Sequence, residues 1–150
     1  MSSGQLKKQG KGKDNLLKVV IDTNVFVSGV LVEAGGPALV IKAWKRSRKY
    51  QLFITEEIIH ESLEVMRRLN VDRGIIADWD KTIRRNTIFV VPTRKIEAIK
   101  EDPSDNKFLE CAIEARADYI ISGDKHLKGL IEFEGIKIIN TRKFLDVLDR

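Results

Sequence analysis

Four acidic side chains in this sequence stand at positions where a folded chain could bring them together. Asp22 comes directly after the apolar run "LKVVI", and Asp124 comes three residues after the apolar run "YII". Asp105 lies in "EDPSDN", at the beginning of a segment with helical spacing, and Glu61 lies inside the helical pattern "TEEIIHESLEVMRRL". If the two apolar runs are strands of one parallel sheet, the acids converge on the edge at which both strands end.

Convergent carboxylates point to a particular chemistry. They repel one another strongly in a partly enclosed site, and proteins tolerate this repulsion where a hard cation binds. Mg²⁺ and Mn²⁺ prefer oxygen ligands of this kind. A cation held in this way can activate a water molecule and stabilise the charge on a phosphoryl group under attack. Together, the four acids therefore indicate an acidic metal site for phosphate-ester chemistry.

Each acid taken alone also has a simpler interpretation. Asp22 and Asp124 are both typical of turns that follow strands. Asp105 is typical of the first turn of a helix, where the helix dipole favours a negative charge. Glu61 is a charge that any solvated helix face could carry. The metal site therefore rests on the joint pattern and on no single residue.

The elements that must position these acids can be read from the hydrophobic pattern. Short apolar segments predict five strands, at residues 17–21, 51–55, 87–91, 118–122 and 136–140. A loop is expected after the first strand, and helical spacing then predicts helices from Pro37 onward and at residues 55–69, 72–86, 103–117 and 141–150. Continuous apolar strands separated by helices are typical of a parallel sheet covered on both faces. We therefore predict an α/β fold with three layers (α/β/α) and a central parallel five-stranded sheet.

The length and charge of the chain suggest one domain behind a basic tail. The sequence has 150 residues, which suits a single domain, expected at residues 16–150. Residues 1–15 are expected to form a flexible tail. Four lysines against one acid in residues 1–14 supply +3 of the net charge of +5. Such a tail can bind nucleic acid phosphates, and it is equally typical of a solubilising extension.

The composition also excludes several classes of protein. Apolar residues at 43% and charged residues at 33% are typical of a soluble globular chain. No apolar run approaches the roughly 20 residues that a membrane-spanning helix needs. The single cysteine, Cys111, rules out an internal disulfide and fits a reducing compartment. We therefore expect a cytoplasmic protein without a membrane partner.

Several motifs, in this order and spacing, resemble the PIN domain family. They are "VVIDTNVFVSGVL", "ITEEIIHESLEVMRRL", "EDPSDNKFLECAIEARADYIISGDKHLKGL" and "IKIINTRKFLDVL". The resemblance covers roughly residues 17–148 and is strongest to the branch that contains toxins of toxin–antitoxin pairs. It implies a Mg²⁺- or Mn²⁺-dependent endoribonuclease acting on RNA, held by a protein antitoxin and forming a homodimer.

The resemblance also assigns residues. Asp22, Glu61, Asp105 and Asp124 match the four acids of the family, so they are the expected catalytic residues and metal ligands. Asn24 and Ser122 match polar positions that support the ligands or bind phosphate. Asp102 and Lys125 are weaker candidates for the site. Ser122 stands where the family often has threonine, and it keeps the hydroxyl group.

Two other functions remain as alternatives to the ribonuclease. The first is a non-catalytic RNA-binding or RNA-processing PIN protein, against which the four intact acids argue. The second is a haloacid-type phosphatase, in which an aspartate after the first strand is the nucleophile. That chemistry needs a second aspartate two residues further on, where this chain has Asn24.

Overall fold

The structure, a computed structural model, describes residues 15–150. The expected basic tail at residues 1–15 therefore lies outside the described part of the chain, apart from Asn15. In the described part, no single helix is long and apolar enough to cross a membrane, although one pair of helices, bent by 85°, reaches the required length and composition together.

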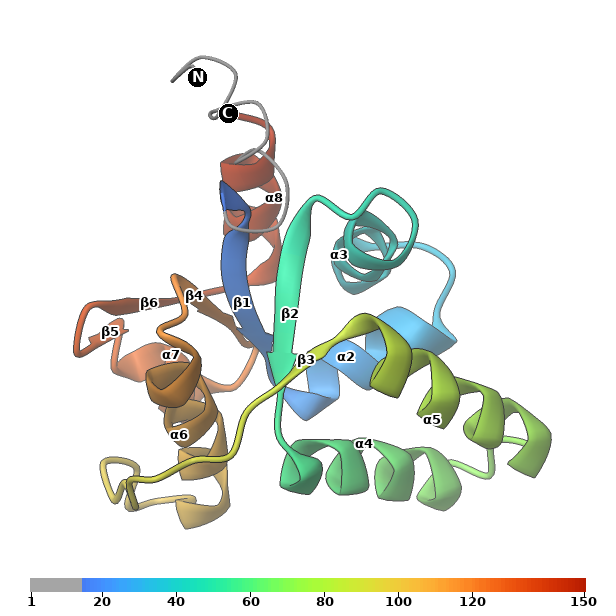
Figure 1. The fold of residues 1–150 in the computed structure, drawn as a ribbon, viewed down its shortest axis with the longest axis horizontal. Coiled ribbons are helices and arrows are strands. Elements are labelled where there is room, and N and C mark those ends of the chain that lie inside the picture. The colour runs from blue at the N-terminus through green and yellow to red at the C-terminus, as the bar shows by residue number, and fades with distance from the viewer. Residues whose placement is uncertain (1–14) are drawn as a thin grey trace, which may run out of the picture.

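A six-stranded sheet forms the centre of the molecule (Figure 1), with the strand order β3-β2-β1-β4-β6-β5. The strands are β1 (Leu17–Ile21), β2 (Tyr50–Ile54), β3 (Ile88–Phe89), β4 (Tyr119–Ile121), β5 (Glu132–Phe133) and β6 (Ile136–Ile139). Every neighbouring pair is parallel except β5 and β6. The predicted α/β fold with a mostly parallel sheet is confirmed, and the predicted number of five strands is one too few.

The additional strand, β5, is antiparallel to β6 and lies at one edge of the sheet. It has two residues, which is too short to produce an alternating pattern in the sequence. Phe133 pairs with Ile136 across a two-residue loop in which Glu134 and Gly135 both have positive φ, at 49° and 88°. This is the conformation of a tight hairpin that joins twisted strands, and a Glu-Gly pair is a weaker signal for it than Asn-Gly.

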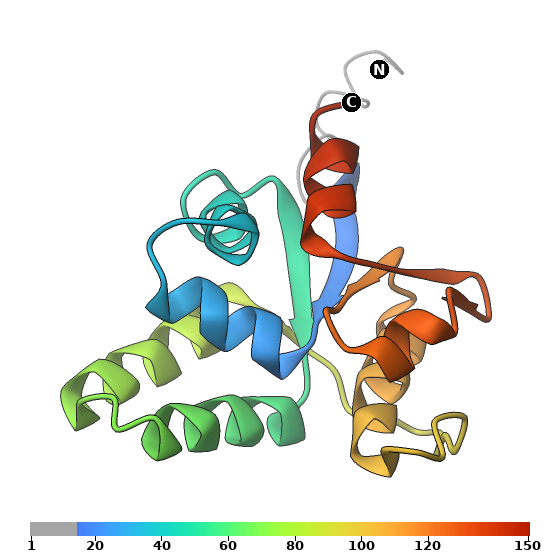
Figure 2. The ribbon, with the colours of Figure 1, turned by 180° about the vertical axis from the view of Figure 1, so that it is seen from behind.

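Helices flank the sheet on both sides. They are α2 (Thr23–Leu31), α3 (Gly36–Lys45), α4 (Glu56–Arg68), α5 (Arg73–Asn86), the 3₁₀ turn η2 (Pro103–Asp105), α6 (Asn106–Ala115), α7 (Lys125–Gly129) and α8 (Thr141–Leu148). In the two opposite views, α2 to α5 lie on one side of β1 and β2, and α6 and α7 lie on the other (Figures 1 and 2). Helix α6 packs across β1, β2 and β4, while α3 packs against β2 and α8.

Helix α2 corrects the expectation of a loop after the first strand. Its sequence, "TNVFVSGVL", is rich in β-branched residues and contains Gly29, and these residues have low helix propensity. Its apolar residues also lack a one-sided stripe, because the helix is buried between α3 and α4. Helix α7 was likewise not predicted, since five residues are too few to show a helical period.

The core is built on the central strands. Val19, Val20 and Ile120 are fully buried, which agrees with the continuous apolar runs of strands covered on both faces. Helix α8 closes the core through Phe144, whose ring lies 5.0 Å from that of Tyr50 in an edge-to-face arrangement. The strands that precede the acids are therefore rigid supports.

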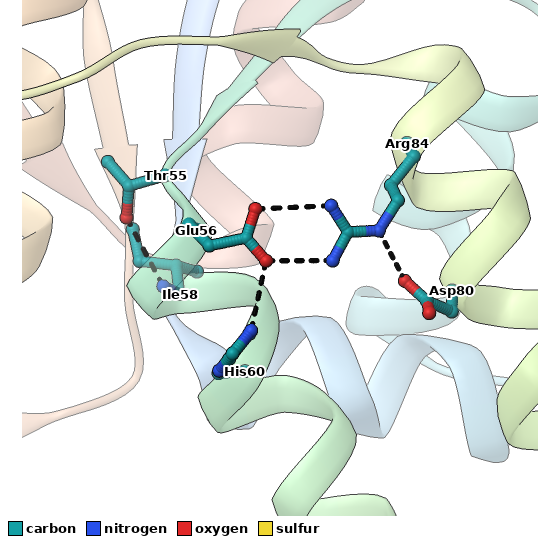
Figure 3. Close-up of polar contacts among 6 residues, drawn as sticks. All are labelled: Thr55, Glu56, Ile58, His60, Asp80 and Arg84. Atoms are coloured by element: carbon teal, nitrogen blue, oxygen red, sulfur yellow. Dashed lines mark hydrogen bonds and ion pairs between the residues drawn. The ribbon is translucent and has the colours of Figure 1, made fainter.

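Helix α4, which carries Glu61, is tied to α5 by a network of exposed charges (Figure 3). Glu56 binds the Arg84 guanidinium through both carboxylate oxygens, at 3.1 and 2.8 Å, and Arg84 also donates to Asp80 at 2.7 Å. His60 contacts Glu56 at 2.9 Å with 71% of its side chain exposed, so this histidine belongs to the surface network. The hydrogen bonds from Arg84 lower the pKa of Glu56. Exposed pairs of this kind contribute little stability, and their effect is to fix the relative position of the two helices.

The close approach of α2 and α3 gives a first prediction. A Cβ atom at Gly29 would lie 2.3 Å from Ile41 Cγ1 and 2.5 Å from the Pro37 carbonyl oxygen. We expect Gly29→Ala to lower the free energy of unfolding by about 1–3 kcal/mol, because the helix backbone cannot move aside without disturbing the core. Urea denaturation measures this change. Gly129→Ala is the control, since no atom lies within 4 Å of its Cβ position. Equal stability of the two variants would contradict the prediction.

Candidate active site

Asp22 and Ser122 meet at the carboxyl ends of two paired strands. Ile21 of β1 is in register with Ile121 of β4, so the residues that follow them lie side by side. The Ser122 hydroxyl donates to Asp22 Oδ2, and the backbone N–H of Val25 donates to Asp22 Oδ1 at 2.8 Å. Asp22 is thereby the N-cap of α2. Asp22 therefore stabilises the start of a helix at the same position where a metal ligand was predicted.

Asp124 follows the same plan at the neighbouring strand. Its Oδ1 accepts hydrogen bonds from the backbone N–H groups of His126 at 2.8 Å and Leu127 at 3.1 Å, which makes it the N-cap of α7. The Asp124 N–H donates to Ser122 Oγ at 2.9 Å. Ser122 is fully buried and is hydrogen-bonded to both aspartates.

The charge of Asp22 is held in an unfavourable environment. The residue is only 4% exposed, and burial raises the pKa of its carboxyl group above the ordinary value. The hydrogen bonds from Ser122, Val25 and Gly123 oppose this shift in pKa, and the charge of Asp124 adds to it. A buried carboxylate beside a second carboxylate is costly unless something neutralises the pair.

Asp105 belongs to the start of α6, the helix that packs across β1, β2 and β4. Asp105 ends the turn η2 at the beginning of α6, and its Oδ2 is buried without a hydrogen-bond partner in residues 15–150. Its pKa is raised to about 6, first by burial and then by the charges of Asp102, Asp124 and Asp22. The three predicted aspartates therefore act on one another, and Asp102 lies close enough to contribute.

Asn106 fixes the segment that leads into this turn. Its side-chain oxygen accepts from Ile99 N–H at 2.9 Å, and its amide group donates to the carbonyl groups of Ile99 and Pro103, both at 3.0 Å. Asn106 is 5% exposed, so these bonds form away from water. This arrangement holds Asp105 at the entrance of α6.

Glu61 is engaged by two residues that the sequence did not single out. Thr23, which stands between Asp22 and Asn24, donates its hydroxyl to Glu61 Oε1. Lys107 donates to Glu61 Oε2 at 2.9 Å and is 7% exposed. Thr23 and Lys107 are 38 and 46 residues from Glu61 in the chain. The signal for them in the sequence was weak: Thr23 follows Asp22 directly, and Lys107 comes two residues after Asp105 in the motifs.

The remaining candidates lie at the margin of the site. Asn24 and Lys125 are exposed in the first turns of α2 and α7, so neither is held against the acids. His126 Nδ1 is buried, lies 3.9 Å from Asp124 Oδ1 and has no hydrogen-bond partner in the described chain. An open groove lies elsewhere, between α4 and α5, where Leu63, Arg67 and Ile76 line it without the four acids.

The oxygen atoms of these acids can be compared with the ligands that a divalent cation requires. As the side chains stand, no three His, Cys, Asp or Glu residues between Asn15 and Arg150 are grouped closely enough to share one ion. The donors nevertheless fit a hard cation: Asp105 Oδ2 is buried and unpartnered, and the carboxylates of Asp22 and Asp124 retain free lone pairs beside their hydrogen bonds. Mutual repulsion of three carboxylates is also what a cation would relieve.

This repulsion predicts how the stability of the metal-free protein depends on pH. The pKa of Asp105 is about 6 in the folded chain against 3.8 for the ordinary group. Between these pH values the folded state keeps a proton that the unfolded state has released, so this group's contribution to the free energy of unfolding falls as the pH rises from about 4 to 6. In EDTA, we expect the midpoint of thermal unfolding to fall less steeply over this window for Asp105→Asn than for wild type.

Asp78→Asn provides the control for this measurement, because Asp78 is an exposed aspartate on α5. It should leave the pH profile of the unfolding midpoint unchanged. Identical profiles for wild type and Asp105→Asn would show that Asp105 has an ordinary pKa in the folded state.

Comparison with known proteins gives a family and a fold. A model of the PIN domain family matches residues 18–126. The crystal structure of PAE2754 from Pyrobaculum aerophilum is similar with a TM-score of 0.56 and 12% sequence identity, over 89% of this chain and 96% of that chain. At this identity the likeness concerns the fold alone. No curated protein matches the chain. The matched residues 18–126 include Asp22, Glu61, Asp105 and Asp124.

Proposed function

The chain belongs to the PIN domain family, and from this premise we propose that it is a Mg²⁺- or Mn²⁺-dependent endoribonuclease that hydrolyses phosphodiester bonds of RNA. PIN domains are generally nucleases and typically use divalent metals, so membership supports nuclease-type activity. The observation that carries the finer proposal is the buried, unpartnered Oδ2 of Asp105 near two other predicted acids: burial, followed by the charges of Asp102, Asp124 and Asp22, raises the pKa of this carboxyl group to about 6.

The chain's own residues have distinct roles in this proposal. Asp22, Asp105 and Asp124 would hold the cation, and Glu61 completes the set of four catalytic acids. When bound, a divalent cation supplies an activated water and neutralises charge on the phosphoryl group under attack. The Ser122 hydroxyl donates a hydrogen bond to Asp22 and accepts one from the backbone N–H of Asp124. In this proposal, Ser122 thereby orients the two ligands relative to each other.

Cleavage of single-stranded RNA by the purified full-length chain tests the proposal. We expect cleavage with Mn²⁺ or Mg²⁺, loss of cleavage in excess EDTA to the level of a protein-free control, and recovery when Mn²⁺ is restored. Cleavage that persists in EDTA would contradict metal dependence. RNA binding without cleavage would favour the non-catalytic alternative. Phosphate release from a phosphomonoester without RNA cleavage would favour the phosphatase.

We also propose that this nuclease is the toxin of a toxin–antitoxin pair, acting in the cytoplasm as a homodimer. The resemblance of its motifs to the toxin branch supports this role. Induced expression should arrest bacterial growth, and Asp22→Asn should remove the arrest at an equal protein level. Growth that is unaffected by an active nuclease would argue for RNA processing instead. Size-exclusion chromatography with light scattering tests the dimer.

A further inference from the structure

A buried ammonium group lies among the proposed catalytic acids. Lys107 is 7% exposed and donates to Glu61 Oε2 at 2.9 Å. The other oxygen of the same carboxylate accepts from Thr23. Both oxygens of Glu61 are therefore engaged by side chains of the protein, whereas Asp105 Oδ2 has no partner in the described chain.

The charge of Lys107 also reaches Asp105. It lowers the pKa of the Asp105 carboxyl group, against the larger effects of burial and of the charges of Asp102 and Asp124. Lys107 thus acts on two of the four acids at once, from a place where it is shielded from water. A cation bound between Glu61 and Asp105 would have the same two electrostatic effects.

Helix stability does not account for this position. Lys107 is the second residue of α6, and the N-terminal turn of a helix disfavours positive charge. A buried ammonium also needs an ionised partner, because burial without one is costly. The Lys107 ammonium also lies 5.2 Å from the centre of the Phe108 ring, but the ionised partner that it needs comes from the acidic centre.

We propose that the Lys107 ammonium takes the place of a second divalent cation, so that the centre binds one ion through Asp22, Asp105 and Asp124. Glu61 is then the counter-ion of Lys107 and is not a metal ligand. The inference rests on the proposed function, because it specifies how many ions that centre holds. It changes the role of one of the four acids and leaves the reaction class unchanged.

Counting bound Mn²⁺ by electron paramagnetic resonance and titration calorimetry tests the proposal without measuring cleavage. Wild type should bind one Mn²⁺ per chain. Lys107→Met, which keeps most of the aliphatic chain and removes the charge, should bind a second Mn²⁺ because Glu61 becomes free. Lys107→Arg is the matched control and should still bind one ion, because it keeps the positive charge.

The double variant Glu61→Gln/Lys107→Met separates the two roles of Glu61. It leaves neither charge of the pair unpaired, so it remains informative if Lys107→Met fails to fold. We expect it to bind one Mn²⁺ with a Kd within about 3-fold of wild type. A metal ligand is worth at least as much as its supporting residues, whose loss typically costs about 10- to 100-fold in affinity. A loss of that size in the double variant would make Glu61 a ligand and overturn the proposal.

The remaining outcomes separate the role of Lys107 from the metal dependence of the nuclease. Two ions on wild type, or a single ion on a folded Lys107→Met, would overturn the role of Lys107 and leave the metal-dependent nuclease standing. Failure of wild type to bind any Mn²⁺ would overturn both.

Discussion

We expect Asp22→Asn to abolish RNA cleavage, by at least about 100-fold, and to leave the fold intact. Loss of a residue that merely supports a metal ligand typically costs about 10- to 100-fold, so loss of a ligand's charge should reach or exceed this range. The fold survives because asparagine is as good an N-cap as aspartate, and its oxygen can still accept from Val25 N–H. Asp124→Asn should behave in the same way at the start of α7.

Initial rates of cleavage of a labelled single-stranded RNA measure this loss, and thermal unfolding in EDTA tests the fold. The unfolding midpoint of Asp22→Asn at pH 7 should be no lower than that of wild type, because burial no longer opposes a charge at this position. Asp146→Asn removes a carboxylate of equal size from the exposed face of α8 and should keep full activity. An active Asp22→Asn enzyme would remove Asp22 from the proposed site.

We expect Asn106→Ala to lower the free energy of unfolding by about 3 kcal/mol. The substitution deletes three hydrogen bonds of a buried side chain and leaves the N–H and carbonyl groups of Ile99 without their partner. Each buried group left unsatisfied costs about 1–3 kcal/mol, partly offset where water can enter. Cleavage should fall as well, because Asn106 holds the turn that carries Asp105.

Asn140→Ala is the control for this stability measurement by urea denaturation. Asn140 accepts one exposed hydrogen bond from Lys143 N–H as the N-cap of α8, and its loss should cost about 1 kcal/mol. If both substitutions cost the same, Asn106 has no special role in holding the segment.

The sequence predicted the elements whose pattern is strong and local. Helices α4 and α5 have clear apolar stripes with acids or caps at the start and arginines at the end, and they were predicted within one residue of their observed bounds. The proximity of Asp22 and Asp124 could be predicted because strand ends in a parallel sheet share an edge, whereas Asp105 was expected there because a helix begins at it. Helix α2 could not be predicted, because its residues have low helix propensity and the helix is stabilised by burial between α3 and α4.

The partners within the site could not be predicted by the same reasoning. Thr23 and Lys107 meet Glu61 from two other elements, and a period in the sequence reports the faces of an element but never which side chain from elsewhere it meets. Asn24 illustrates the same limit. It stands beside Thr23 in the motif, but one step around the helix turns it towards solvent.

The use of aspartates as helix caps has a consequence for how this protein can change during evolution. A single base substitution converts an aspartate codon into an asparagine codon, and at positions 22 and 124 the new residue keeps the cap. A well-folded copy with a silenced centre is therefore one mutation away from the active one. If the proposed nuclease binds RNA through residues outside the centre, selection could retain such a copy for binding alone, which offers a short route from a nuclease to a regulator.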